Sequence, residues 1–491
     1  MKILLILPPL MVQEREQYGV TPPLGLAYLA AVLEKNGYEV GLLDCIVEGY
    51  DNHVRQDGYF HIGLDWHAIE RRVRIFAPDV VGISCIFSLM FPEALKVAEI
   101  VKGIDTNIKV VMGGAHPSSL PYAVLKNENV DFITIGESEI TLLELVRCIE
   151  QNDTGLSAID GLGYKMDGVA ALNPKTRFIE NIDEIPFPAR HLLPMEKYYK
   201  AGESHGGLKR DRYASVITSR GCPGNCIYCS IHTIWGTRWR ARSPDNVLDE
   251  IEHLVNDYGV EEIHFEDDNL TFDRERAKMI FHGIIDRGLD ITWTTPNGLA
   301  VWTLDEEILK LMKISGCYQI NLGIESGNEE VLRKVIRKPF KLEKVREIVK
   351  KIGELGIWSH GFFILGMPGE TKQTIMDTID FATNLNLDSA SFFVATPYPG
   401  TKLCDICKEH GYVPDYDTQD LRVQSSMIST EEFTSDEVLQ WQKLAYRRFM
   451  LHTMKREIMT LNLVRRLMRL KTMDDVRFIY RKINRLVKVV V

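Results

Sequence analysis

Short apolar segments alternate with helical patterns along most of this chain, and this alternation constrains the fold more than any other feature. Within residues 1–150, each apolar segment is followed by apolar residues at three- and four-residue spacing. The expected strands are 2–7, 39–43, 79–84, 109–112 and 132–135. Strands separated by helices pair in parallel. We therefore expect a doubly wound, flavodoxin-like α/β domain over residues 1–150.

The alternation stops and then returns further along the chain. Residues 151–205 lack it and contain several prolines, which predicts a linker. Six more strands are expected near 214–219, 262–266, 291–295, 319–324, 360–365 and 389–395. These six βα units predict a partial (β/α)6 TIM-like barrel over residues 206–415, with its chemistry at the carboxyl ends of the strands. Residues 416–491 are expected to form a helical C-terminal region.

Three of the nine cysteines, Cys222, Cys226 and Cys229, lie within eight residues in the loop after the first barrel strand. The other six are scattered, which is too sparse for a disulfide scaffold. The C-x₃-C-x₂-C spacing lets three thiolates wrap one corner of a compact cluster. A structural zinc site needs four ligands. The loop therefore indicates either zinc with His232 as the fourth ligand or an iron–sulfur cluster with one open iron, where a substrate binds.

With Tyr228 just before the last cysteine, this loop closely resembles that of the radical S-adenosylmethionine (SAM) superfamily. The resemblance implies that the three cysteines hold a [4Fe-4S] cluster whose open iron binds the amino and carboxylate groups of SAM. An electron donor such as flavodoxin or ferredoxin would reduce this oxygen-sensitive cluster. SAM would then be cleaved to methionine and a 5′-deoxyadenosyl radical.

The same resemblance implies SAM contacts at the ends of later barrel strands. The family has a Gly-Gly-Glu stretch after the second strand, where this chain has acids, so Glu266 or Asp267 is expected to bind the SAM amino group. Glu325 would bind the ribose unless it caps a helix, and Asn297 is a SAM contact or a cap for the helix near Asp305. The remaining expected SAM contacts are Tyr228, Ile364 and Gly366.

Four motifs also resemble class B radical SAM enzymes, which carry a cobalamin (B12)-binding domain: PPLGL at 22–26, VGIS at 81–84, GGAHP at 113–117 and WRARS at 239–243. The resemblance implies cobalamin contacts from strand-end residues that otherwise serve as turn residues: Ser84, Gly113, Gly114, His116, Pro117, Gly136 and Glu137. Some cobalamin domains have Asp-x-His-x-x-Gly after the first strand, but residues 8–18 contain no histidine. We therefore expect no cobalt ligand from that motif, and His116 to face the corrin edge or a turn.

The resemblance implies a methyltransferase that moves a methyl group through methylcobalamin to an unactivated carbon or phosphorus atom. Oxidative cyclases of tetrapyrrole synthesis and hopanoid-pathway enzymes share the architecture, so a non-methylating cyclisation or rearrangement is the alternative. A methylthiotransferase is disfavoured because the first strand ends in Pro8-Pro9 and not in a cysteine. A non-enzymatic cobalamin sensor would have no need of an open cluster.

The net charge of −10 divides unevenly, because residues 441–491 contain 14 basic and 3 acidic residues. This basic tail either caps the barrel, contacts an anionic membrane surface that presents a lipid substrate, or binds nucleic acid. Slight aromatic interleaving makes nucleic acid the least favoured partner, and a small-molecule or lipid substrate is expected. The chain shows neither a membrane-spanning stretch nor a signal-peptide cleavage pattern, so we expect a cytoplasmic protein.

Overall fold

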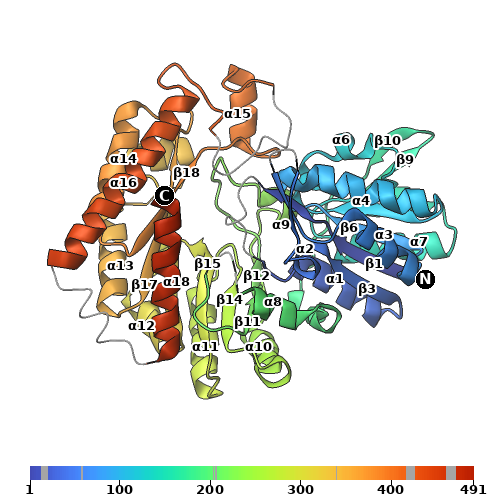
Figure 1. The fold of residues 1–491 in the computed structure, drawn as a ribbon, viewed down its shortest axis with the longest axis horizontal. Coiled ribbons are helices and arrows are strands. Elements are labelled where there is room, and N and C mark those ends of the chain that lie inside the picture. The colour runs from blue at the N-terminus through green and yellow to red at the C-terminus, as the bar shows by residue number, and fades with distance from the viewer. Residues whose placement is uncertain are drawn as a thin grey trace. The chain divides into compact units, whose positions relative to one another are not determined.

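The computed structural model describes residues 1–12, 20–56, 59–202, 204, 207–338, 340–415, 426–459 and 472–490. The chain divides into two compact units, each built around its own sheet (Figure 1). The first holds the described parts of Met1–His205 and Ser230–Arg240. The second holds those of Gly206–Cys229, Ala241–Tyr416 and Arg422–Val491.

The first unit contains a seven-stranded sheet in the order β10-β9-β8-β7-β6-β1-β3. Its five parallel strands are β1 (Lys2–Leu7), β3 (Glu39–Asp44), β6 (Val80–Ser84), β7 (Lys109–Gly113) and β8 (Phe132–Thr134). Strand β6 is buried along its whole length, as in parallel sheets with both faces covered. These strands confirm the doubly wound domain expected from the sequence.

Helices follow the parallel strands of the first unit and pack in pairs. Helix α1 (Leu24–Lys35) packs beside α7 (Glu139–Glu150), and α3 (Trp66–Phe76) packs beside α4 (Phe91–Ile104). The shorter helices are α2 (Cys45–Glu48), α5 (Ala115–Ser119), α6 (Pro121–Leu125), α8 (Met195–Ala201) and α9 (His232–Trp235). A small antiparallel sheet of β2 (Leu10–Val12), β4 (His53–Gln56) and β5 (Tyr59–Ile62) completes the unit.

The segment expected as a linker over 151–205 contains two strands of the main sheet. Strand β9 (Leu162–Met166) pairs antiparallel with β8, and β10 (Val169–Leu172) pairs antiparallel with β9. Asp167 and Gly168 form the two-residue turn between them, both with positive φ (51° and 78°). Asp-Gly is a strong hairpin signal. The linker expected from the prolines of this segment therefore includes a hairpin that was not predicted.

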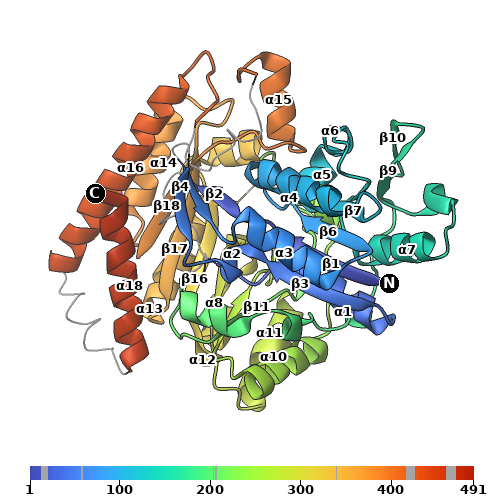
Figure 2. The same cartoon turned by 45° about the vertical axis from the view of Figure 1, so that its right-hand side comes forward.

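The second unit contains six parallel strands that follow one another in chain order (Figure 2). They are β11 (Tyr213–Val216), β14 (Glu262–Phe265), β15 (Thr292–Leu299), β16 (Cys317–Glu325), β17 (Trp358–Leu365) and β18 (Ser389–Val394). The intervening helices are α10 (Pro244–Tyr258), α11 (Arg274–Asp286), α12 (Glu306–Ile314), α13 (Leu342–Glu354) and α14 (Lys372–Asn384). Strands β11 and β18 are the two edges of the sheet, so the expected partial barrel is confirmed.

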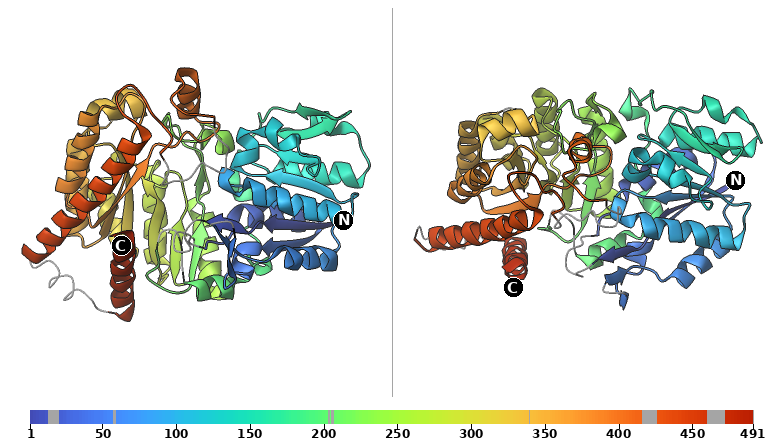
Figure 3. Two further views of the ribbon diagram at one scale, coloured as in Figure 1. Left: turned by 45° about the horizontal axis from the view of Figure 1, so that its top comes forward. Right: turned by 90° about the horizontal axis from the view of Figure 1, so that it is seen from above.

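Two long C-terminal helices belong to the second unit (Figure 3). Helix α16 (Ser435–Met459) covers edge strand β18, where Gln442 and Tyr446 hydrogen-bond to the backbone of Phe392. Helix α18 (Met473–Val490) packs Phe478 against Tyr318 and Trp358, which stand at the first residues of β16 and β17. Thus α18 covers the amino-terminal ends of these strands.

Helices α16 and α18 lie in the C-terminal region that was expected to be helical, and Arg465, Arg466 and Arg469 of the basic tail lie outside the described residues. α15 (Lys402–His410) precedes these helices. In the part of the chain that the structure describes, we find no helix with the length and apolarity needed to cross a membrane.

Candidate functional site

The three clustered cysteines lie on the loop that follows β11, at the carboxyl-terminal edge of the second sheet. Their side chains are half-buried and form no disulfide, whereas the other six cysteines are buried. Gly224 donates its N–H to Cys222 Sγ at 3.4 Å. A Cβ on Gly224 would come within 3.3 Å of Cys222 Sγ and 3.9 Å of Cys226 Sγ. Glycine at this position therefore keeps a side chain out of the space between these two thiols.

Backbone hydrogen bonds hold the middle of the loop on both sides. The Ile227 N–H donates to Ile336 O at 3.3 Å, and Ile227 O accepts the N–H of Leu403 at 2.8 Å. The Ile227 side chain is buried in the barrel core. These contacts fix the backbone between Cys226 and Tyr228, so the positions of both side chains are set by the barrel and not by the loop alone.

Tyr228, Glu325 and Lys338 lie within electrostatic reach of Cys226. Lys338 Nζ donates to Glu325 Oε1 at 2.8 Å and to Gly323 O at 2.9 Å. Burial raises the pKa of Tyr228, and the Glu325 charge raises it further, so the phenol stays protonated. The buried Glu325–Lys338 ion pair therefore acts electrostatically on one cluster cysteine.

Two opposing effects act on the pKa values of the thiols. Burial raises the pKa of both Cys222 and Cys226, while the ammonium of Lys338 favours their thiolates. Iron and zinc bind cysteine as the thiolate. Three thiols on one short loop near a buried cation fit an iron–sulfur cluster. The cation offsets the negative charge of the three thiolates. His232, the alternative fourth ligand for zinc, begins α9 in the first unit.

Among the residues that the structure describes, no group of three His, Cys, Asp or Glu side chains is placed to hold one metal ion.

The acids after β14 divide into different roles. Asp267 Oδ1 accepts hydrogen bonds from Thr218 Oγ1 at 2.7 Å and from Ser219 Oγ at 2.5 Å, and its Oδ2 accepts the Thr218 N–H at 3.1 Å. Asp267 therefore braces the segment that leads into the cysteine loop. Asp268 is the acid of this strand end whose charge raises the pKa of Cys222. Burial and the charge of Asp267 raise the pKa of Asp268 itself to about 7.

Glu266 and Asn297 join neighbouring strands. Glu266 Oε1 accepts a hydrogen bond from Ser215 Oγ at 3.1 Å, and its carbonyl accepts one from Asn297 Nδ2 at 2.8 Å. Asn297 lies within β15 and does not cap α12, because Asp305 occupies that cap and accepts the Ile308 N–H at 2.9 Å. The alternative helix-cap role of Asn297 is therefore wrong.

Ile364 and Gly366 lie at the end of β17. Ile364 is buried, and Gly366 has a φ of +86°. A Cβ on Gly366 would meet Val438 of α16 at 2.9 Å. The N–H groups of Gly366 and Met367 both donate to Glu370 Oε2, at 2.9 and 2.8 Å. Burial raises the pKa of Glu370 to about 7. The tight turn here depends on glycine.

In the first unit, the expected cobalamin residues meet at the carboxyl ends of β6 and β7. Ser84 and Gly113 end these two strands and are register partners. Gly114 has a φ of +118°, and a Cβ there would come within 2.6 Å of Cys85 O. A side chain at this position would collide with backbone. Pro117 is buried in α5, directly after this turn.

His116 is buried, and one of its ring nitrogens has no hydrogen-bond partner. Nδ1 lies 3.0 Å from Ser88 Oγ, and the ring packs on Phe91 with centroids 4.3 Å apart. Nε2 is unpartnered, as is Oε2 of the buried Glu93 on α4. Burial lowers the pKa of His116 to about 4, so the ring is neutral near pH 7. Unpartnered buried polar atoms are rare in proteins unless a ligand or water satisfies them.

The loop after β6 adds exposed apolar surface beside these atoms. Ile86 and Phe87 follow Cys85 directly and are 43% and 52% exposed. Polar atoms awaiting a partner and an exposed apolar loop at one sheet edge fit a large ligand with amide and ring surfaces, such as cobalamin. Gly136 and Glu137 instead hold the unit together: Gly136 N–H donates to Ser118 Oγ at 2.9 Å, and Glu137 pairs with Arg240 at 2.9 Å.

Sequence reasoning missed Lys338, Asp268 and Glu93. A lysine is mostly an exposed residue, so nothing in the letters around Lys338 indicates that its ammonium is buried against Glu325. Asp268 adjoins the two acids that were considered, and only the turn after β14 decides which of the three faces the cysteines. Glu93 looks like an ordinary acid in the first turn of a helix.

Known proteins resemble both units. Residues 216–382 match the Radical SAM superfamily, and residues 15–146 match the B12 binding domain. The cytidylyl-2-hydroxyethylphosphonate methyltransferase of Streptomyces wedmorensis is 36% identical over 444 residues, covering 84% of this chain and 82% of that protein. An uncharacterised methyltransferase of Pyrococcus horikoshii is 36% identical over 453 residues, covering 92% and 93%.

A more distant relative performs a different reaction. The anaerobic magnesium-protoporphyrin IX monomethyl ester cyclase of Rubrivivax gelatinosus is 27% identical over 457 residues, covering 92% of this chain and 78% of the cyclase. Among solved structures, the radical SAM methyltransferase TsrM of Kitasatospora setae, with tryptophan substrate and a SAM analogue bound, superposes with a TM-score of 0.67. It is 21% identical and covers 84% of this chain and 77% of its own, so this likeness concerns the fold.

Proposed function

The chain belongs to the radical SAM superfamily as a cobalamin-dependent methyltransferase, and we propose that Cys222, Cys226 and Cys229 hold its [4Fe-4S] cluster. The observation that carries this assignment is the placement of three half-buried thiols on one loop, with Gly224 between two of them and a buried cation beside them. The cluster supplies an electron and an open iron for SAM, and the cobalamin carries the methyl group.

The residues around the loop have separate tasks in this proposal. Tyr228 and Glu325 line the SAM position, because both lie within electrostatic reach of Cys226. Asp268, whose charge acts on Cys222, would bind the SAM amino group, a role expected of Glu266 or Asp267 from the sequence. Ile364 and the turn at Gly366 would contact the adenine as buried apolar surface and backbone, and Asn297 would act through the backbone of Glu266.

For cobalamin, the proposal assigns direct contact to Ser84, Gly113, Gly114, His116 and Pro117. The glycines let the ligand approach the backbone, and the free Nε2 of His116 offers one hydrogen bond. Because Nδ1 is held by Ser88 and the ring by Phe91, this nitrogen is fixed in place. Gly136 and Glu137 support the edge from within the protein, through Ser118 and Arg240.

The methyl acceptor in this proposal is a small molecule, and its accepting atom is an unactivated carbon or phosphorus. The Streptomyces wedmorensis relative is named for a cytidylyl-linked phosphonate, which makes that compound the first one to test. A flavodoxin or ferredoxin would supply the electron. Contact of the basic tail with an anionic membrane remains part of the proposal only for a lipid acceptor.

A non-methylating cyclisation is the second candidate, and the likeness to the Rubrivivax gelatinosus cyclase favours it. The two candidates differ in their products. Methyl transfer from SAM leaves S-adenosylhomocysteine, whereas a cyclisation that uses SAM only as a radical source forms 5′-deoxyadenosine and methionine without it.

The test is anaerobic reconstitution with iron, sulfide and cobalamin, followed by measurement of iron content and of SAM products in the presence of reductant. We expect cluster iron and 5′-deoxyadenosine in the wild type and their loss in Cys226→Ala. Cys148→Ala, which changes a cysteine buried on α7, is the matched control and should keep both. Undiminished 5′-deoxyadenosine in Cys226→Ala would refute the assignment of the cluster ligands.

A further inference from the structure

Lys338 is a buried lysine whose ammonium is held from three sides. Its Nζ donates to Glu325 Oε1 and Gly323 O, and it lies 5.7 Å from the centroid of the Trp302 ring. Its side chain is nearly as inaccessible as that of Glu325, at 10% and 7% exposed. Burying a lysine is costly unless the charge is paired, so this arrangement has a fixed geometry and a permanent positive charge.

The backbone on both sides of the ion pair is shaped around it. Glu325 adopts a φ of +70°, next to a register shift between Gly323 and Glu325 in β16. A Cβ on Gly323 would lie 2.7 Å from Lys338 Nζ and 2.8 Å from Glu325 Oε1. Left-handed backbone at a non-glycine residue is strained and is found mainly where the surroundings enforce it. The ion pair therefore occupies the space that a side chain on β16 would fill.

The segment that delivers Lys338 is also the segment that holds the cysteine loop. A π-helical turn, η7 (Val331–Ile336), ends with Arg337 at a φ of +65°, and the next residue is Lys338. Ile336 O accepts the N–H of Ile227, which lies between Cys226 and Tyr228. A backbone hydrogen bond thus links the segment that carries Lys338 to the loop that carries the thiols.

We propose that Lys338 is a positioning residue that fixes Glu325 beside the cysteine loop and, as a permanent buried cation, raises the reduction potential of the cluster. The inference rests on the proposed assignment of the three cysteines. Adding an electron makes a thiolate-bound cluster more negative, so a nearby cation stabilises the reduced form and a nearby anion destabilises it. Lys338 would then raise the reduction potential of the cluster, and Glu325 would lower it.

The experiment is an electron paramagnetic resonance redox titration of the reconstituted full-length protein without SAM, with iron and sulfide content measured on each sample. Lys338→Met should lower the midpoint potential, and Glu325→Gln should raise it. Lys338→Arg should stay near the wild type because it keeps the charge, and the double variant Lys338→Met/Glu325→Gln should return toward it. Lys350→Met, at an exposed position on α13, is the control for loss of a lysine.

Opposite shifts of the two single variants support the proposal, since a role in packing alone has no reason to follow the sign of the charge. Shifts in the same direction, or unchanged potentials at full iron content, would overturn it. If Lys338→Met does not retain the cluster, Glu325→Gln and Lys338→Arg decide: the proposal requires a raised midpoint potential in Glu325→Gln and a wild-type potential in Lys338→Arg, and any other result would overturn it. Iron that persists in Cys226→Ala would instead show that the cluster assignment has failed, which keeps the two failures distinct.

Discussion

At the scale of single residues, buried or partly buried acids near the two sites differ in their hydrogen bonds, ion pairs and pKa values. The Asp267 carboxylate accepts hydrogen bonds from Thr218 and Ser219, which lie just before the cysteine loop. The Glu325 carboxylate forms an ion pair with Lys338. Burial raises the pKa of Glu93 and of Asp268 to about 7, so each carboxyl is partly protonated near pH 7. Neighbouring acids in one chain thus differ in role through their surroundings.

Asp267→Asn should destabilise the barrel unit by about 1–3 kcal/mol. The N–H group of the amide would face a donor of Thr218 or Ser219 whose hydrogen bond the carboxylate now accepts. Urea unfolding of the apoprotein measures this. Glu266→Gln is the control, since Glu266 adjoins Asp267 and lies at a less buried position. Equal stabilities of Asp267→Asn and the wild type would contradict the bracing role.

Glu93 should make the first unit less stable as the pH rises. Its folded pKa of about 7 lies above the unfolded value of 4.5, so the folded state keeps a proton that the unfolded state has released. The free energy of unfolding therefore falls between about pH 4.5 and 7, by up to roughly 3 kcal/mol. Glu93→Gln removes this loss.

Urea unfolding at pH 5 and pH 8 tests the Glu93 prediction. The difference in stability between Glu93→Gln and the wild type should move in favour of the variant at pH 8. Glu99→Gln, at an exposed position on the same helix, should keep the pH dependence of the wild type. A Glu93→Gln variant with wild-type pH dependence would show that the carboxyl is already ionised in the folded state.

At the scale of elements, period and spacing predicted the strands because each one is a short apolar run between helical patterns. The cysteine loop was predictable for the same reason, as it follows the first strand of the barrel. The β9–β10 hairpin was missed although Asp167-Gly168 marks its turn. Lys338 could not be found, because its burial depends on the π-helical turn η7 and on the register shift in β16, which no local pattern encodes.

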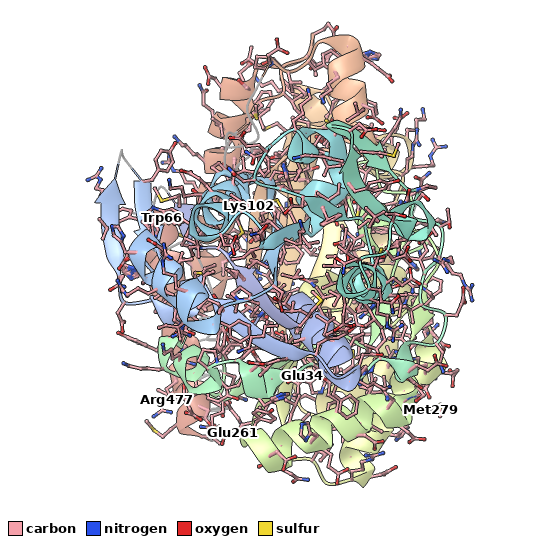
Figure 4. All side chains as sticks on the ribbon, turned by 90° about the vertical axis from the view of Figure 1, so that its right-hand side faces the viewer. Glu34, Trp66, Lys102, Glu261, Met279 and Arg477 are labelled. Atoms are coloured by element: carbon pink, nitrogen blue, oxygen red, sulfur yellow. The ribbon has the colours of Figure 1, made fainter. Side chains whose placement is uncertain are left out.

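Helix α18 gives the basic tail a structural role at the amino-terminal ends of the barrel strands. Lys209 pairs with Asp475 at 2.7 Å, while Arg477 and Arg481 both pair with Asp211. Figure 4 labels Arg477 on this helix. These partners belong to the barrel unit, so part of the positive charge of the tail is neutralised within it.

Phe478→Ala should loosen α18, because Phe478 is 7% exposed and packs on Tyr318 and Trp358. Loss of a buried phenylalanine costs about 3–5 kcal/mol in well-packed cores. Hydrogen exchange followed by mass spectrometry should show faster exchange over residues 473–482. Tyr480→Ala, at a 65% exposed position, should not. Equal exchange in both variants would argue against docking through Phe478.

At the scale of the whole molecule, two sheets present their candidate residues at the carboxyl ends of parallel strands. In the first unit these are the turn at Gly114 and the free nitrogen of His116, and in the second they are the cysteine loop and the Glu325–Lys338 pair. The net charge of −10 describes neither unit well, since the excess of basic residues is confined to the C-terminal tail.

Product analysis of the reconstituted protein tests the central claim most directly. SAM with a deuterated methyl group, a reductant and cytidylyl-2-hydroxyethylphosphonate as the first acceptor should yield 5′-deoxyadenosine, S-adenosylhomocysteine and an acceptor that carries the deuterated methyl group. If this acceptor is not a substrate, the cobalamin-loaded protein should still form S-adenosylhomocysteine in a single turnover. Formation of 5′-deoxyadenosine without any S-adenosylhomocysteine, with cobalamin bound, would contradict methyl transfer and favour the cyclase reaction.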